Sequence, residues 1–203
     1  KKFLVLAVKS SDKINKEYIE NLNLLNDNIK KIKNVNSTFS ILDAPILLLN
    51  NLSLSDLASR EIININNSQD DLNLILKEFT NSPLYKDQII NNNQNISSII
   101  IYLKDDKKLQ NLKNKIDNSL SGTSDKNKLI SQYREEKNEY SNKNKILIKT
   151  IRNILSNHNN KYQYFLGGID MISNDTIDFV KNDIIVFSFA VLFLIIIILL
   201  IIY

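Results

Sequence analysis

The residues with chemical potential gather near the C-terminal end of the chain. Two of the three glycines are adjacent, at Gly167 and Gly168. A glycine pair permits a positive φ or the close approach of another backbone. Grouped carboxylates could act as an acid–base pair or bind a metal ion, and the aspartates that follow the glycines are Asp170, Asp175, Asp178 and Asp183. Helix capping and solvation at a membrane surface explain these carboxylates more simply.

No catalytic constellation accompanies these residues. The absence of cysteine excludes disulfides and thiolate chemistry, and His158, the only histidine, argues against a zinc enzyme. The sequence contains neither a G-x-S-x-G nucleophile motif nor a glycine-rich phosphate loop. We therefore expect no catalytic residue, metal or cofactor, and we expect His158 to lie exposed in a polar loop. The net charge is +4, but no dense block of Lys or Arg occurs, so no nucleic-acid partner is predicted.

The last residues form an uncharged apolar run from Ile184 to Tyr203. A helix rises about 1.5 Å per residue, so about 20 apolar residues span the ~30 Å hydrocarbon core of a bilayer. The run is too far from the N-terminus for a signal peptide. We predict a helix over residues 173–203 with a membrane core at 184–203, capped near Ser173, Asn174 and Asp175. The lipid bilayer is thus an expected partner.

Alternating strands and helices are predicted before this helix, in residues 1–172. Apolar runs and alternation indicate strands, while apolar residues three and four apart indicate helices. The order β-α-β-(α)-β-α-α-β is typical of an α+β sandwich of the ferredoxin-like, split βαβ type, with one sheet face covered by helices and the other exposed or packed on a neighbour. The predicted strands cover 1–10, 35–45, 95–104 and 161–172, the helices cover 12–33, 69–80, 106–120 and 125–156, and a loop with short helical turns covers 47–67.

Residues 106–158 leave two arrangements open. Their polar middle, at 134–145, could project from the domain as part of a long helical hairpin. Alternatively, both helices are solvated on one side and cover the sheet on the other. Charged helix faces are usually just solvated, which favours the second arrangement.

Four segments, taken in their order and spacing, resemble the first extracytoplasmic domain of RND superfamily exporters. The similarity is greatest to the predicted exporters allied to MMPL and sterol-sensing-domain transporters, and it extends from that domain into the second membrane helix. The segments are "SILDAPILL" (40–48), "SLSDLAS" (53–59), "NSPLYKDQII" (81–90) and "YFLGGIDMISNDTIDFVKNDIIVF" (164–187).

This resemblance implies that the chain is a fragment of a multi-pass transporter in the bacterial inner membrane, with residues 1–172 on the extracytoplasmic side. The expected partners are the other membrane helices of the same protein and a lipid-like substrate. Such pumps use the proton-motive force through acids in central membrane helices, so no proton-relay residue is assigned in this chain. The ferredoxin-like porter domains of this family agree with the predicted strand order.

Two functions from different classes follow. In the first, the chain is part of an exporter of lipid-like or amphipathic compounds, and the residues from Gly167 to Asp183 form the joint between domain and membrane. In the second, it is the ectodomain and membrane span of a bacterial sensory receptor. An enzyme is not predicted, because no site is visible.

Overall fold

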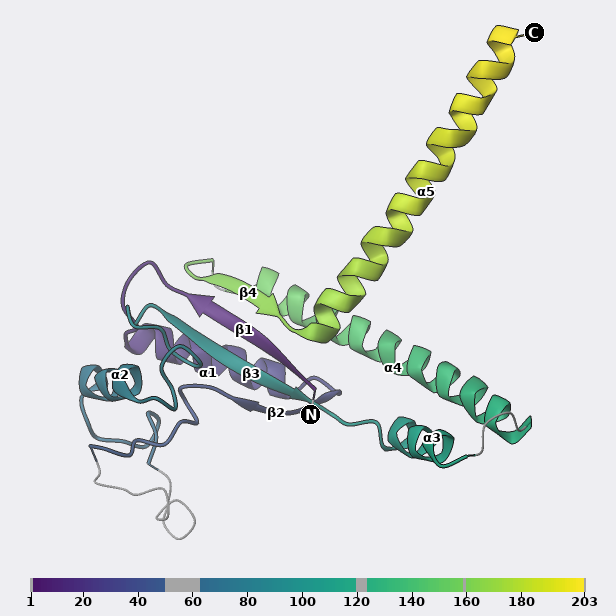
Figure 1. Cartoon of the computed structure of the whole chain (residues 1–203). Helices are drawn as coiled ribbons and strands as arrows, with labels where there is room; N and C mark the ends of the chain where they lie inside the picture. The colour runs from purple at the N-terminus through teal and green to yellow at the C-terminus, as the bar shows by residue number, and fades with distance from the viewer. Residues whose placement is uncertain (1, 50–62, 120–123, 159, 203) are drawn as a thin grey trace.

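The computed structural model describes residues 2–49, 63–119, 124–158 and 160–202. These form an α+β structure in which one four-stranded antiparallel sheet has the order β2-β3-β1-β4 (Figure 1). The strands are β1 (Phe3–Lys9), β2 (Val35–Phe39), β3 (Ile96–Leu103) and β4 (Gln163–Gly167), and the helices are α1 (Lys16–Lys30), α2 (Leu72–Asn81), α3 (Lys107–Asp117), α4 (Ser124–Ser156) and α5 (Ile169–Ile202).

Strand β1 lies between β3 and β4 and sets the two faces of the sheet. Its residues Leu4, Leu6 and Val8 are buried, whereas Phe3 on the opposite face is half exposed. Successive side chains point to opposite faces of a strand, so the alternation in sequence becomes a buried face and an open one. Leu6 is paired with Ile99 of β3 and Leu166 of β4, which continues the buried face across the sheet.

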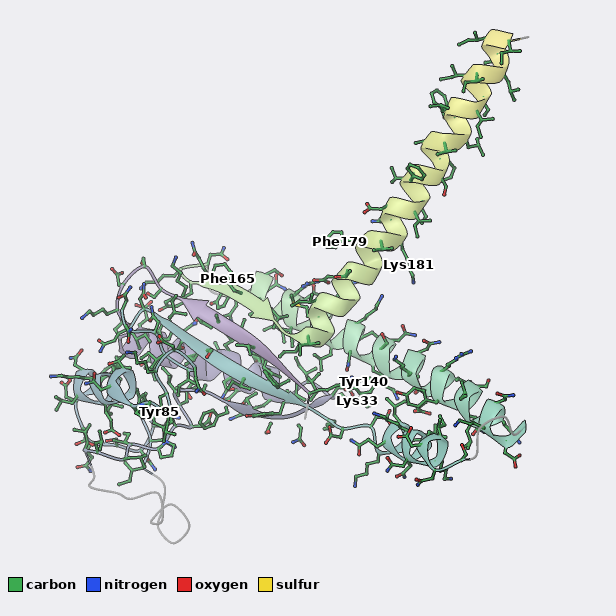
Figure 2. The ribbon with its side chains drawn as sticks, viewed as in Figure 1. Lys33, Tyr85, Tyr140, Phe165, Phe179 and Lys181 are labelled. Carbon is green, nitrogen blue, oxygen red and sulfur yellow. The ribbon has the colours of Figure 1, made fainter. Side chains whose placement is uncertain are left out.

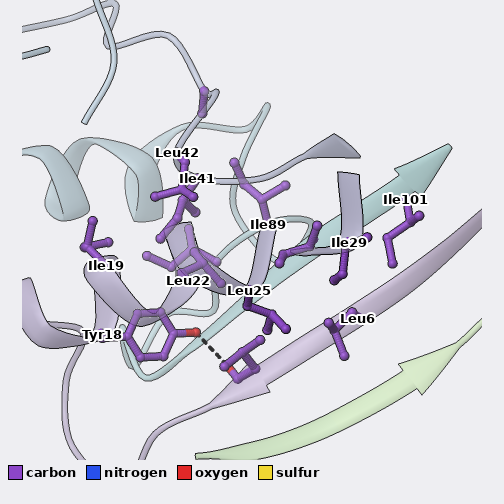
Figure 3. Close-up of a cluster of buried hydrophobic side chains, with 14 of the residues drawn as sticks. Leu6, Tyr18, Ile19, Leu22, Leu25, Ile29, Ile41, Leu42, Ile89 and Ile101 are labelled. Carbon is purple, nitrogen blue, oxygen red and sulfur yellow. Dashed lines mark hydrogen bonds between the residues drawn. The ribbon is translucent and has the colours of Figure 1, made fainter. Parts of the chain in front are cut away.

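Helix α1 covers the buried face of the sheet, as Figure 3 shows. The helix begins after Asn15, whose side-chain oxygen accepts a hydrogen bond from the backbone N–H of Tyr18 at 2.9 Å. Tyr18 opens a buried stripe at helical spacing that continues through Leu22, Leu25 and Ile29. The Tyr18 hydroxyl donates to the carbonyl of Val8 at 2.7 Å and lies 2.7 Å from the Ser97 hydroxyl. Burial raises the pKa of Tyr18 well above its ordinary value of 10.0, so the phenol stays neutral.

The predicted second strand is wrong beyond Phe39, where β2 ends. Ser40 begins a turn in which the carboxylate of Asp43 accepts hydrogen bonds from the Ser40 backbone N–H and hydroxyl, at 3.0 and 3.1 Å. Both Ile41 and Leu42 are buried, an arrangement that a strand with one open face does not permit. The alternation in the sequence therefore extends past the true end of the strand.

Helix α2 holds the segment after this turn through a buried carboxylate. Glu78 is 6% exposed and accepts hydrogen bonds from the backbone N–H groups of Leu47, Leu48 and Leu49, at 2.6, 3.0 and 3.0 Å. Tyr85, labelled in Figure 2, donates from its hydroxyl to the carbonyl of Pro45. The predicted loop over 47–67 is described only in part, because residues 50–62 lie outside the described residues.

Helices α3 and α4 pack on each other, and the two ends of α4 have different surroundings. Near its C-terminal end, Leu147, Ile148 and Ile151 belong to the core of the domain. Its N-terminal part extends beyond the sheet beside α3, in which no residue is buried (Figure 1). There Glu136 is buried and forms an ion pair with Lys108 of α3. The interpretation that both helices cover the sheet is therefore wrong for α3 and the first part of α4.

Helix α5 leaves the sheet edge and extends away from the domain (Figure 1). Its segment Phe179–Ile202 has a mean hydropathy of 3.6 and is not buried against any described part of the chain. Side chains project from it on all sides in Figure 2. By length and composition, this helix can cross a membrane.

Candidate functional site

The candidate site is the joint between β4 and α5, and Gly168 is its turning point. Gly167 still pairs with Val5 of β1, and a Cβ added there would meet only the Val5 carbonyl oxygen, at 3.9 Å. At Gly168 the φ angle is +149°, and an added Cβ would lie 2.7 Å from Leu4 Cδ2 and 3.2 Å from the Phe3 carbonyl oxygen. A residue with a side chain is therefore strained at position 168 but not at 167.

A single residue separates the strand from the helix. The prediction that the last strand extends to 172 and that the helix starts near Ser173 is wrong, because β4 ends at Gly167 and α5 begins at Ile169. The backbone N–H of Ile172 donates to the carbonyl of Gly168 at 3.0 Å, which closes the first helical turn. The positive φ at Gly168 redirects the chain earlier than the apolar pattern of 169–172 suggests.

The first turns of α5 are packed on the domain. Met171 is partly buried against the core, and α5 contacts both β1 and α4. The Arg152 guanidinium of α4 donates to the carboxylate of Asp175 at 2.7 Å, and these side chains are 49% and 32% exposed. A pair this exposed contributes no more than about 1 kcal/mol to stability, so it orients the helices more than it holds them.

The other predicted joint residues do not converge with Asp175. Asp183 is exposed and lies eight positions further along α5, about 12 Å at the rise of a helix. Asp170 and Asp178 belong to α5, but their side chains lie outside the described residues. Among the described side chains, no group of three or more His, Cys, Asp or Glu could hold a metal ion. The described acids thus form one ion pair and one exposed charge.

His158 is not exposed as predicted. Its ring is half buried and packs edge-on against Tyr164 at 5.8 Å between ring centroids. The Nε2 atom is buried without a hydrogen-bond partner among the described residues. No described acid lies within bonding distance to activate it, so the ring acts in packing near the start of β4.

Sequence reasoning did not identify Leu4 and Arg152 as parts of the joint. Leu4 is distant in sequence from Gly168 and meets it only because β1 pairs with β4. Arg152 and Asp175 are separated by a whole strand, so no spacing rule links them. The weak signal that existed was an arginine in the most apolar part of α4.

Comparisons of the chain with protein-family models, with curated proteins and with solved structures found no match. The class of protein therefore follows from the fold and the joint alone. It is an α+β domain with a four-stranded antiparallel sheet, joined through one glycine to an apolar helix that is long enough to span a membrane.

Proposed function

We propose that this chain is part of an RND-type secondary-active exporter of the MMPL and sterol-sensing-domain branch. In this proposal the domain before α5 lies on the extracytoplasmic side of a bacterial inner membrane. It couples movement of the membrane helices to the efflux of lipid-like or amphipathic compounds.

The order of the strands supports a ferredoxin-like porter domain. Strands β1 and β2 both pair antiparallel with β3, so they run parallel to each other with β3 between them, and α1 connects them. Strands β3 and β4 likewise flank β1, and α3 and α4 connect them. Each half is thus a βαβ unit split by a strand of the other half. The resemblance of the four sequence segments to these exporters points to the same fold.

The short, packed joint is the observation that carries the proposal. A flexible linker would absorb any tilt of a membrane helix before it reached the domain. Here only Gly168 separates β4 from the helix, α5 contacts β1 and α4, and the Arg152–Asp175 pair orients α5 against α4. A displacement of α5 would therefore act directly on the sheet, as coupling in a transporter requires.

Substitution at the joint tests this coupling in the complete transporter. Gly168→Val should reduce efflux of an amphipathic dye from cells or vesicles much more than it reduces the amount of protein inserted in the membrane. Gly167→Ala is the matched control, because an added Cβ has room there, and it should leave both quantities unchanged. Equal transport by Gly168→Val and wild type would show that the joint has no mechanical role.

The sequence of the gene beyond Tyr203 separates the exporter from the sensory receptor. The exporter predicts further apolar spans, with acidic residues inside some of them. A signalling segment, such as a HAMP-like helix pair or a kinase domain, would instead identify a receptor ectodomain that uses the same joint to send a signal inward.

A further inference from the structure

An apolar groove lies between the C-terminal end of α1 and the C-terminal half of α4. Its volume is ≈ 520 Å³, within the range of about 300–1,000 Å³ that is typical of small-molecule sites. Ile32 and Leu147 form its base and pack against the domain core, whereas Ile146 stands in its wall and is 67% exposed. The groove thus presents aliphatic surface to its surroundings.

Polar groups near the base of the groove already have hydrogen-bond partners within the protein. The Thr150 hydroxyl, which could have been a partner for a polar ligand, donates to the carbonyl of Ile146 in its own helix at 2.9 Å. At the end of α1, the carbonyl of Ile29 already accepts from the backbone N–H groups of Lys31 and Ile32. A ligand on the base of the groove would therefore meet mainly side-chain carbon, although Asn28 and Asn34 also line the groove.

The rim of the groove is cationic. Lys31, Lys33 and Lys143 line it, and the Lys104 ammonium reaches the same rim by donating to the carbonyl of Lys33 at 2.7 Å. Lys143 is balanced by Glu139, at 2.7 Å. Neither Lys31 nor Lys33 has a carboxylate partner within the described part of the chain. Lys33 is labelled in Figure 2.

We propose that this groove binds a single-chain anionic amphiphile. The alkyl chain would lie along Ile32, Ile146 and Leu147, which removes their exposed surface from water. The carboxylate or phosphate head would lie at the rim, where Lys31 and Lys33 supply unbalanced positive charge and hydrogen-bond donors. A neutral chain of the same length would gain only the first of these contributions.

Where it concerns transport, this inference rests on the proposed function. It specifies that the amphipathic substrate is anionic and that it binds in this groove. Binding itself can be measured on the chain without transport. Failure to bind would refute the groove and leave the exporter proposal standing. Failure of the exporter proposal would leave a binding site of another role.

Photo-crosslinking on the full chain in discs of zwitterionic lipid tests the proposal. The probe is a dodecanoate that carries a diazirine in its chain, labelled sites are mapped by mass spectrometry, and affinity comes from competition with dodecanoate, dodecyl phosphate or dodecanol. The test variant is Lys31→Gln/Lys33→Gln, at two exposed positions. The matched control, Lys16→Gln/Lys149→Gln, removes the same charge from exposed positions of α1 and α4 outside the groove.

We expect labelling within residues 28–34 and 143–150. The test variant should weaken dodecanoate and dodecyl phosphate roughly fivefold, as two exposed charge pairs would, and should leave dodecanol and the control variant unchanged. Ile146→Asp should abolish labelling by the carboxylate probe while far-UV circular dichroism stays unchanged, because this side chain is exposed.

Five results would overturn the proposal, four of which concern the amphiphile. These are labelling confined to α5, equal affinity of the test and control variants, an equal loss for the alcohol and the acid, or normal labelling of Ile146→Asp. A co-purifying polypeptide that crosslinks through the groove in place of the amphiphile would also overturn it.

Discussion

Helices α4 and α5 have nearly the same length, 33 and 34 residues, yet they are stabilised in different ways. In α4 the buried residues lie mostly three and four positions apart on one face, and the rest of the helix surface is mostly polar, with Ile146 as an exposed apolar exception. The buried residues are Glu136, Tyr140, Asn144, Leu147, Ile148 and Ile151. In α5 none of the segment Phe179–Ile202 is buried, and from Ile184 onward it is uncharged, with apolar side chains on all sides.

This difference teaches that the distribution of apolar residues around a helix, more than its length, determines its surroundings. An apolar stripe on one side of a helix can be buried against a sheet or against a neighbouring helix, and α4 packs against both. A helix that is apolar on every side cannot be satisfied by one neighbour, and its backbone is satisfied within the helix, which suits lipid. The Arg152–Asp175 pair lies where these two helices meet.

The largest expected effect comes from an aspartate introduced into each helix. In α4 it should destabilise the domain, whereas in α5 it should reduce membrane insertion. Ile151→Asp places a charge in the domain core and should destabilise the domain by about 4 kcal/mol or more. Leu192→Asp, near the middle of the apolar segment, should cost about 3 kcal/mol of membrane insertion and leave the domain folded. Hydrogen exchange in β1 and β3 reports the first effect, and carbonate extraction of membranes reports the second. Loss of hydrogen-exchange protection of β1 and β3 in Leu192→Asp would contradict this distinction between domain folding and membrane insertion.

The two glycines of the joint should differ by the next largest amount. Gly168→Ala should destabilise the domain by roughly 2–4 kcal/mol, because a positive φ is combined with close contacts to the backbone of β1. Gly167→Ala should change stability by less than about 0.5 kcal/mol, since an added Cβ meets one atom at an ordinary distance. Urea unfolding of both variants measures this. Equal midpoints would mean that the end of β4 shifts freely, and that the joint is looser than described.

A smaller effect concerns the pH dependence of the domain alone. Burial raises the pKa of Tyr18, so its stabilising contribution is complete below pH 10, the ordinary value, and is lost as the pH rises through the higher folded value. Tyr18→Phe should cost about 1–2 kcal/mol at pH 7 through lost hydrogen bonds. Its deficit relative to wild type should shrink above pH 10, because phenylalanine has no proton to lose.

The control for this prediction is Ser97→Ala, which removes a hydrogen-bond partner of Tyr18 and keeps the ionisable group. Thermal unfolding should show that Ser97→Ala loses as much stability between pH 7 and pH 10.5 as the wild type does. Tyr18→Phe should lose less stability over the same range. Parallel pH profiles of Tyr18→Phe and wild type would assign the alkaline loss to other groups.

The smallest effect is expected where the two helices touch. Arg152→Gln and Asp175→Asn should each cost less than about 1 kcal/mol, because both side chains are partly exposed. A double-mutant cycle should give a coupling of about 0.2–1 kcal/mol that decreases at high salt. A coupling that is larger and insensitive to salt would indicate that lipid or protein shields the pair in the membrane.

Sequence patterns located most elements but misplaced the ends of two strands and the start of α5. The strand ending at Leu103 and the helix beginning after Asp106 fall inside their predicted ranges, because the strand is a β-rich apolar run and Asp106 caps the helix. The second strand was extended past Phe39, since alternation cannot show that Ile41 and Leu42 are both covered. The fourth was extended past Gly167, because the turn at Gly168 depends on contact with β1.

The candidate site was predicted as a region but not as a set of contacts. Gly168 and Asp175 do lie at the joint, whereas Asp183 stands further along α5 and His158 packs in the domain. The groove beside α1 was not predicted at all. Its lysines and isoleucines lie on two segments more than a hundred residues apart, and each segment alone reads as an ordinary amphipathic helix end.

The amino-acid sequence by itself determined the apolar character of α5 and the period of each strand and helix, because these depend on neighbours along one chain. Only the tertiary structure decided the pairing of β1 with β4, the tight contact at Gly168, the Arg152–Asp175 pair and the cationic groove. These depend on distances between segments that are remote in sequence, and such distances are set when side chains fill one common core.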